Sequence, residues 1–242
     1  MRTALAALRA EIGRLERRHS GEVLPFGLAA LDAHLPGGGL ARAALHEVSG
    51  AGAGAEHGAA AALFAAGLAA RCAGPVLWCL ARPDLFAPAL AQAGLEPDRV
   101  IYVTAGDDAG VLGCLEEGLR HGGLGAVVGE VARLPMVASR RLQLAAEAGG
   151  TLGLVVRRLR RGADAFAQPS AATTRWRIAA LPAAPLPVPG VGRPRWRLEL
   201  VRCRGAEAAT FDVEACDGAG RLAVPAHLGD RPAAARGAGA AA

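Results

Sequence analysis

The chain contains no lysine, so its permanently charged cations are all arginines. A phosphate-binding loop of the G-x-x-x-x-G-K-[ST] type needs a lysine for the β- and γ-phosphates and a hydroxyl for magnesium. The absence of lysine excludes a complete loop of this type in every register. Because alanine, glycine and arginine dominate the composition, we interpret the missing lysine as the bias of a GC-rich genome.

Cysteine is scarce, and its spacing forms no motif. None of the five cysteines belongs to a C-x-x-C pair, and most of them lie inside apolar runs. Such spacing is typical of buried thiols in a reducing cytoplasm, and it predicts no metal site.

Continuous apolar segments of membrane-spanning length are also missing. The alanine-rich stretch 59–70 is short and flanked by glycine, and the first residues do not resemble a signal segment. We therefore expect a soluble, cytoplasmic protein without membrane contact. The net charge of +5 is compatible with nucleic-acid binding, but such an excess is also common in proteins that bind none.

The stretch from Ala43 to Leu68 organises the rest of the chain. A short apolar strand (45–48) leads through a glycine-rich turn into an alanine-rich helix. The glycines of the turn are Gly50, Gly52 and Gly54. This is the shape of a loop that points backbone N–H groups at a phosphate. However, Glu56 stands at the lysine position and His57 at the hydroxyl position, so the nucleotide loop is degenerate.

After this helix, short apolar runs alternate with helical patterns. The expected strands are 76–80, 100–103, 126–128 and 152–156, and the expected helices are 84–93, 107–120 and 136–148. Buried strands that alternate with helices predict a mostly parallel sheet with helices on both faces, an α/β fold.

The pattern changes after residue 156. In RWRIA and RWRLELVR, Trp176 and Trp196 alternate with arginines, and Thr210–Val213 resembles a further strand. Period-two alternation predicts an antiparallel extension of the sheet. We expect the tryptophans in the core and the arginines on the outside.

Both ends of the chain differ from its middle. Residues 3–18 place four apolar side chains on one helical face: Leu5, Leu8, Ile12 and Leu15. That face either packs on the core or contacts a partner, and the sequence does not decide between them. The last residues lack any period and predict disorder. The expected division is an N-terminal helix (1–22), a core (23–224) and a disordered tail (225–242).

The order of these elements resembles the RecA-like ATPase core. The resemblance covers residues 24–224 and includes GLAALDAHLPGGGLARAALHEVSGAGAG and the strands RWRI and RWRLEL. Within that superfamily, the short form with a failed nucleotide loop is similar to the ImuA family. These are RecA-like (SulA/RecA-like) accessory proteins of bacterial damage-inducible mutagenesis. The resemblance implies a RecA-like sheet with antiparallel edge strands.

The resemblance also places the family's catalytic positions. The catalytic glutamate corresponds to Arg82 and the Walker B aspartate to Gly129, with Glu130 one residue further on. Because a shift of one residue turns a strand side chain to the other face, Glu130 is a weak substitute. Three failed positions imply a pseudo-ATPase with no catalytic residue, metal or cofactor. Two alternatives stay open: nucleotide binding without hydrolysis, and an ATPase with an atypical site.

The DNA-binding loops of the family are reduced in this chain. The first corresponds to residues 132–135, and the second to RRLRRGADAFAQPSAATT after residue 156. Arginines with an aromatic side chain can hold single-stranded DNA through phosphate contacts and stacking. A solvated basic face is an equal alternative. The candidate DNA or partner contacts are Arg157, Arg158, Arg160, Arg161 and Phe166.

As a whole, the resemblance implies a non-catalytic accessory or scaffold protein in SOS-induced, error-prone translesion DNA synthesis. The implied partners are an ImuB-type, Y-family-like protein, the error-prone polymerase complex and RecA, with single-stranded DNA as a further ligand. A cell-division inhibitor is a third hypothesis, suggested by the SulA part of the family description, and no residue of this chain supports it.

Overall fold

The computed structural model describes residues 22–52, 54–158, 164–184, 186 and 189–225. The expected N-terminal helix and the expected C-terminal tail lie outside the described residues, apart from Glu22 and Pro225. Those two predictions therefore remain predictions.

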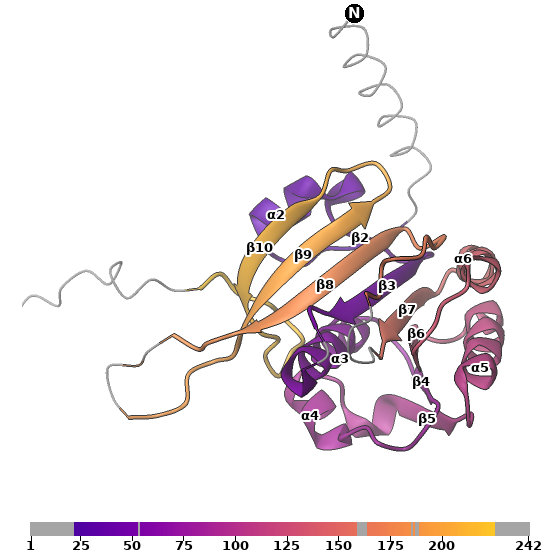
Figure 1. Ribbon diagram of the computed structural model, residues 1–242, viewed down its shortest axis with the longest axis horizontal. Coiled ribbons are helices and arrows are strands. Elements are labelled where there is room, and N and C mark those ends of the chain that lie inside the picture. Colours follow the sequence, from indigo (N-terminus) through magenta and orange to yellow (C-terminus); the bar gives the residue numbers. More distant parts are fainter. Residues whose placement is uncertain (1–21, 53, 159–163, 185, 187–188, 226–242) are drawn as a thin grey trace, which may run out of the picture.

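In the described part of the chain, an eight-stranded sheet forms the centre of the molecule (Figure 1). Its order is β10-β9-β8-β3-β7-β6-β4-β5, parallel from β8 to β5, with β9 and β10 antiparallel at one edge. This confirms the expected α/β fold with antiparallel edge strands. The strands are β3 (Leu45–Gly50), β4 (Val76–Leu80), β5 (Val100–Thr104), β6 (Ala126–Val131), β7 (Leu152–Arg157), β8 (Thr174–Leu181), β9 (Arg195–Cys203) and β10 (Ala209–Glu214).

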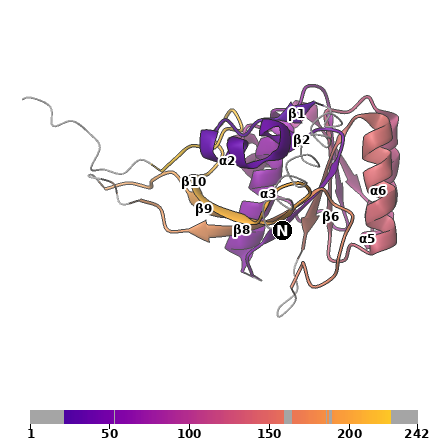
Figure 2. The same cartoon turned by 90° about the horizontal axis from the view of Figure 1, so that it is seen from above.

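Helices cover both faces of the sheet, as Figure 2 shows from above: α5 and α6 lie on one side, and α2 and α3 on the other. The helices are α2 (Ala29–His34), α3 (Ala55–Ala70), α4 (Ala87–Gln92), α5 (Asp108–His121) and α6 (Met136–Gly149). Two 3-10 turns (Pro36–Gly38, Pro97–Arg99) and a small sheet of β1 (Val23–Leu24) and β2 (Leu40–Ala41) complete the fold.

Aromatic side chains fill the core on the α3 face. Phe64 of α3 packs against Phe26 and Trp176, with ring centroids 6.0 Å apart in both pairs. Trp196 meets Phe64 edge-on at 6.4 Å. Both tryptophans are buried, which confirms the prediction that they belong to the core.

Leucines of α5 and α6 fill the opposite face. Leu115, Leu119 and Leu142 are fully buried against the sheet. Gly129 of β6 lies directly under Leu115, so closely that a Cβ at position 129 would overlap the leucine side chain. Glycine is therefore required there by packing.

Strand β8 differs from the prediction in two respects. It pairs parallel with β3, and only its pairing with β9 is antiparallel. Its Arg175 is buried instead of facing out, since its guanidinium is paired with Glu47 of β3. A strand inside the sheet has neighbours on both sides, so simple alternation did not reveal which polar residues have buried partners.

Two element boundaries also differ from the prediction. Helix α4 begins at Ala87 instead of Asp84, because proline is tolerated only in the first helical turn and Pro88 lies there. Asp84 is thus left in the preceding connection. Strand β6 continues to Val131 instead of ending at Val128. Gly129 and Glu130 are therefore strand residues that face opposite sides of the sheet.

Among the described residues, no helix is long and apolar enough to cross a membrane. All five cysteines lie among the described residues, and none of them forms a disulfide. Cys72 and Cys79 are buried as expected, and burial raises the pKa of Cys79 to about 12. Cys114, Cys203 and Cys216 are only partly buried.

Candidate functional site

The parallel strands deliver their carboxyl ends to one edge of the sheet, where α/β proteins bind ligands. Two neighbouring depressions lie there. One, of about 370 Å³, is lined by the glycine loop, α3 and α4, and the other, of about 690 Å³, lies over the ends of β4 and β6. Arg158, which follows β7, lines both of them.

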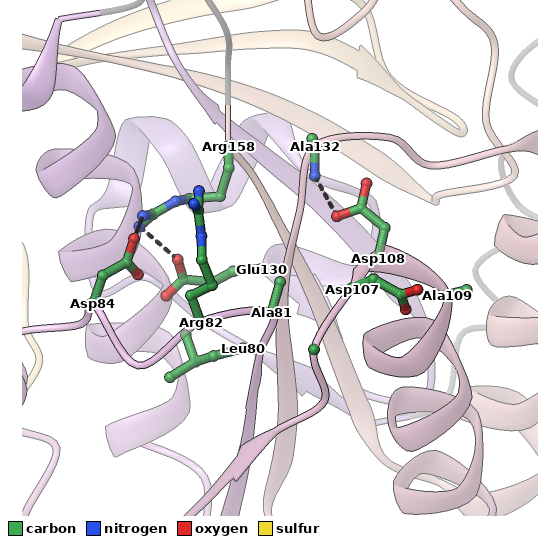
Figure 3. A pocket seen from close by; sticks show the side chains of 11 residues that line it. Leu80, Ala81, Arg82, Asp84, Asp107, Asp108, Ala109, Glu130, Ala132 and Arg158 are labelled. Atoms are coloured by element: carbon green, nitrogen blue, oxygen red, sulfur yellow. Dashed lines mark hydrogen bonds and ion pairs between the residues drawn. The ribbon is translucent and has the colours of Figure 1, made fainter.

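Arg158 is held between two carboxylates (Figure 3). Its Nη1 donates to Glu130 Oε2 at 2.9 Å, and its Nη2 donates to Asp84 Oδ2 at 2.6 Å. The three side chains come from the ends of β7 and β6 and from the connection after β4. An arginine therefore stands between the carboxylates at the edge where the RecA-like ATPases that this sequence resembles hold a metal and phosphates.

Glu130 is the most buried carboxylate of this group, with 3% of its side chain exposed. Its Oε1 accepts a hydrogen bond from Trp78 Nε1 at 2.9 Å. Burial raises the pKa of Glu130, and the hydrogen bond from Trp78 and the charge of Arg158 oppose that rise. Both oxygens of the carboxylate thus have protein partners.

The register of β6 decides which side chain enters the site. Glu130 faces the α3 side, toward Trp78 and Arg158. Gly129 faces α5 and lies under Leu115. The candidate positions Gly129 and Glu130 are therefore on opposite faces, as the one-residue shift predicts.

The glycine loop keeps its shape through packing of its own. A Cβ at Gly50 would come within 2.8 Å of the backbone of His57, so the turn requires glycine there. His57 Nδ1 accepts a hydrogen bond from the backbone N–H of Ala180 at 3.0 Å, which ties the start of α3 to β8. The imidazole of His57 therefore has a structural role. Glu56 is exposed, and its carboxylate lies beside Gly54 of the loop, where it adds negative charge.

Three other side chains line the depression over the ends of β4 and β6: Arg82, Asp107 and Asp108. Arg82, at the place of the family's glutamate, lines the same depression as Glu130 (Figure 3). Asp107 caps α5 by accepting from the N–H of Gly110. Asp108 accepts from the N–H groups of Ala132 and Arg133 at 3.0 and 2.9 Å. Both aspartates therefore have structural roles.

A buried ion cluster around Glu47 escaped the sequence analysis. Glu47 of β3 is fully buried and pairs with Arg157 at 2.5 Å and with Arg175 at 2.8 Å. Ser170 donates a hydroxyl hydrogen bond to the same carboxylate at 2.7 Å. A lone glutamate inside the apolar strand LHEVSG was the signal that could have found the cluster, because buried carboxylates need cationic partners.

This cluster fixes the segment that follows β7. Arg157 also donates to the carbonyl of Ala165, and Arg175 donates to the carbonyl of Gln168. Phe166 packs under the guanidinium of Arg175, with 4.5 Å from Cζ to the ring centroid. With only 10% of its side chain exposed, Arg157 is not a free surface contact.

The candidate DNA or partner contacts thus separate into different environments. Arg157 is buried in the Glu47 cluster, whereas Arg158 is 45% exposed in its clamp. Phe166 is half-buried under arginine. Arg160 and Arg161 lie outside the described residues, so their part in a contact remains a prediction.

The site does not fit a magnesium–triphosphate group. Its one deeply buried carboxylate, Glu130, is neutralised by Arg158, and the loop presents Glu56 where the charge of a phosphate needs a cation. Among the described residues, no three histidine, cysteine, aspartate or glutamate side chains gather as metal ligands. What the arrangement does chemically is hold the strand ends together by ion pairs.

Comparison with known proteins gives the following relatives. No protein-family model matches the chain. Protein ImuA of Caulobacter vibrioides, from strain NA1000 / CB15N and from strain CB 15, is 43% identical over 203 residues, which is 80% of this chain and 83% of the relative.

Solved structures share the fold at lower identity. The RadB recombinase is 17% identical, with a TM-score of 0.56 over 84% of this chain and all of that one. At this identity the match concerns the fold alone, which is RecA-like. SulA from Pseudomonas aeruginosa matches 46% of this chain with a TM-score of 0.38, too low to support an inference.

Proposed function

Because the chain belongs to the ImuA family, we propose that it is a non-catalytic accessory protein in SOS-induced, error-prone translesion DNA synthesis. The observation that carries the non-catalytic part is the clamp of Arg158 between Asp84 and Glu130. It supplies an internal cation where an ATPase of this superfamily brings magnesium and phosphate. The altered positions Glu56, Arg82 and Gly129 support the same proposal.

The partners follow from the family. We propose that the chain binds an ImuB-type, Y-family-like protein and, through it, the error-prone polymerase, and that its RecA-like surface also meets RecA. A scaffold requires the surface of the fold and not nucleotide turnover. The proposal places the protein in the cytoplasm, where these partners act.

Binding of single-stranded DNA is a second candidate function. A depression of about 690 Å³ lies between the two reduced loops, and its cationic lining comes from Arg133, Arg157 and Arg158. The acidic Asp108 and Asp164 border it as well. Because Arg157 is buried with Glu47, DNA contact here depends on Arg133, Arg158 and the arginines at 160 and 161.

The test of the scaffold proposal is capture of purified partners together with ATP hydrolysis on the same samples. The immobilised chain is offered an ImuB-type protein and RecA separately. We expect specific capture of the ImuB-type protein without hydrolysis above background. Hydrolysis without capture of either partner would contradict the scaffold proposal and show that the chain is an ATPase. Inhibition of a tubulin-like division protein would favour the hypothesis of a cell-division inhibitor.

Matched variants locate the contact. Arg160→Ala with Arg161→Ala removes the charges of the second loop, and Arg197→Ala removes an exposed charge from the far edge of the sheet. If the second loop binds single-stranded DNA, the first variant weakens binding and flattens its salt dependence by about two phosphate contacts, while the control does neither. Unchanged binding in the double variant would exclude this loop as the DNA contact.

A further inference from the structure

Helix α3 is apolar on every side after its first turn. Residues 58–70 contain only glycine, alanine, leucine and phenylalanine. A helix of this kind is normally covered all round. One side of α3 packs on the sheet, but Ala55, Gly58 and Ala59 are exposed. Part of an apolar helix surface is therefore open to solvent.

The open side of α3 forms one wall of a groove, and α4 with the connection before it forms the other (Figure 1). This α3–α4 groove has a volume of about 370 Å³. Phe86 borders it with 69% of its surface exposed. Along α3, the lining positions share one helical face: Ala55, Gly58, Ala59, Ala62 and Leu63.

The walls of the groove decide the form of its occupant. Neither wall is a strand, so an extended chain finds no edge with which to pair. An occupant must then satisfy its own backbone hydrogen bonds, as a helix does. Glycine and alanine at positions 58, 59 and 62 permit a close approach of two helix axes. At a rise of about 1.5 Å per residue, the stripe from Ala55 to Leu63 is about 12 Å long, which is roughly two helical turns.

Arg157, which lines the groove, has a donor without an acceptor. Its side chain is nine-tenths buried, and its Nη groups donate to Glu47 and to the carbonyls of Ala132 and Ala165. The buried Nε–H donates to no described group. Such a donor is costly to leave unsatisfied, and an oxygen atom of an occupant can accept from it.

The charges beside the groove decide the charge of the occupant. The two arginines of the lining are already paired: Arg157 with Glu47, and Arg158 with Asp84 and Glu130. A polyanion such as DNA therefore finds no free cation in this groove.

Glu56 is the charged group beside the groove that no described arginine pairs. Its carboxylate lies next to Gly54 of the lining and is 64% exposed. Among the described residues its one ion-pair neighbour is His57, with 3.7 Å between Nε2 and Oε1. The unmatched charge at this end of the groove is negative, so a basic side chain of the occupant is complementary to it.

From these observations we propose that the α3–α4 groove is the docking site for a basic, apolar helix of a partner protein. Apolar side chains of that helix pack on Ala59 and Ala62 and against Phe86, and a lysine or arginine pairs with Glu56. This inference rests on the proposed scaffold function, and it assigns the contact with the ImuB-type protein to the groove.

The affinity of the full-length chain for the purified ImuB-type protein tests the proposal. Ala59→Arg fills the groove and repels a basic helix, so we expect binding at least about tenfold weaker. Ala148→Arg is the matched control, because Ala148 is also an exposed helical alanine and lies on α6, outside the groove. Its affinity should equal that of the parent. Circular dichroism shows that both variants are folded.

Glu56→Gln tests the charge. It should weaken binding by about threefold to tenfold and reduce the salt dependence, because one ion pair is lost. Glu117→Gln, at a carboxylate of α5 that is 80% exposed, should change neither. Hydrogen exchange then locates the contact, since the amides of residues 86–92 should exchange more slowly in the complex than in the free chain.

Four results would overturn the proposal. Parent-like affinity of Ala59→Arg would place the contact elsewhere and leave the scaffold function intact. Slowed exchange at residues 86–92 in the chain alone, growing with its concentration, would assign the groove to a second copy. The same effect from magnesium–ATP would assign it to a nucleotide. If the parent captures no ImuB-type protein, the scaffold proposal fails together with this one.

Discussion

Arg157 and Arg158 are neighbours in the chain, yet their guanidinium groups neutralise carboxylates on different strands. Arg157 pairs with Glu47 of β3 in the interior, and Arg158 pairs with Glu130 of β6 at the edge of the candidate site. One dipeptide thus joins β7 to the strand on each side of it. The two pairs differ in exposure, so their loss should have different consequences.

Glu47→Gln should destabilise the protein strongly, because it leaves Arg157 and Arg175 buried without an anion. Breaking a buried ion pair in this way costs about 3–5 kcal/mol of unfolding free energy. Glu199→Gln is the control, since Glu199 is 40% exposed and its pair with Arg177 should contribute less than about 1 kcal/mol. Urea unfolding followed by circular dichroism measures both variants. Equal effects would show that the Glu47 cluster is not a stabilising unit.

Restoring the residue types of a working nucleotide loop should not restore ATP hydrolysis. The double variant Glu56→Lys with His57→Thr supplies the lysine and the hydroxyl, but Arg82 and Gly129 still stand where the family has carboxylates. It also removes the acceptor for the N–H of Ala180, at a cost of about 1 kcal/mol. A coupled assay for ADP release should therefore stay at background. Magnesium-dependent turnover by the double variant would contradict the account of the site.

His46 should make the fold sensitive to acid. It is fully buried between Thr174 and the carbonyl of Ala41, and desolvation lowers its pKa from 6.5 to about 4. Between these values the unfolded chain binds the proton and the folded chain does not, so stability falls as the pH is lowered through this window. The loss amounts to about 3 kcal/mol by pH 4.

Unfolding of the parent and of His46→Gln at pH 7 and pH 4.5 isolates this effect. The carboxylates titrate in both proteins, so the difference between their pH dependences belongs to His46. We expect the parent to lose more stability than the variant on acidification. An equal loss in both would show that His46 keeps an ordinary pKa in the folded state.

Gly129→Asp should destabilise the protein without creating a metal ligand. The new side chain would have to enter the space of Leu115, which is fully buried, and overpacking of this kind costs about 1–3 kcal/mol. Thermal unfolding compares the variant with the parent. A Gly129→Asp protein as stable as the parent would show that the α5 face can adjust.

The order of elements could be predicted from the sequence because each buried strand is a short apolar run, whereas the apolar residues of each helix recur at helical spacing. Strand Val76–Leu80 and helix Met136–Gly149 follow from pattern alone. The parallel pairing of β8 does not, because alternation reports which residues share a face and not the direction of the neighbouring strand. The start of α4 was missed because Pro88 outweighed the helical pattern before it.

The sequence identified the positions where the nucleotide loop has lost its usual residues. It did not identify the ion pairs that occupy the candidate site instead. The positions Glu56, His57 and Gly129 could be identified by counting along a motif. That Arg158 bridges Asp84 and Glu130 depends on three strand ends that meet only in the folded protein. The same holds for Glu47, whose partners are 110 and 128 residues away in the chain.

The contact of Gly129 with Leu115 bears on how such a chain can evolve. Every glycine codon becomes an aspartate or a glutamate codon by one nucleotide change, so a carboxylate at this position is a single mutation away. That mutant begins with a damaged core unless residue 115 becomes smaller first. Selection for stability therefore opposes the reversal wherever the leucine is present, and the packing of α5 preserves the altered strand end whatever use the cell makes of the surface.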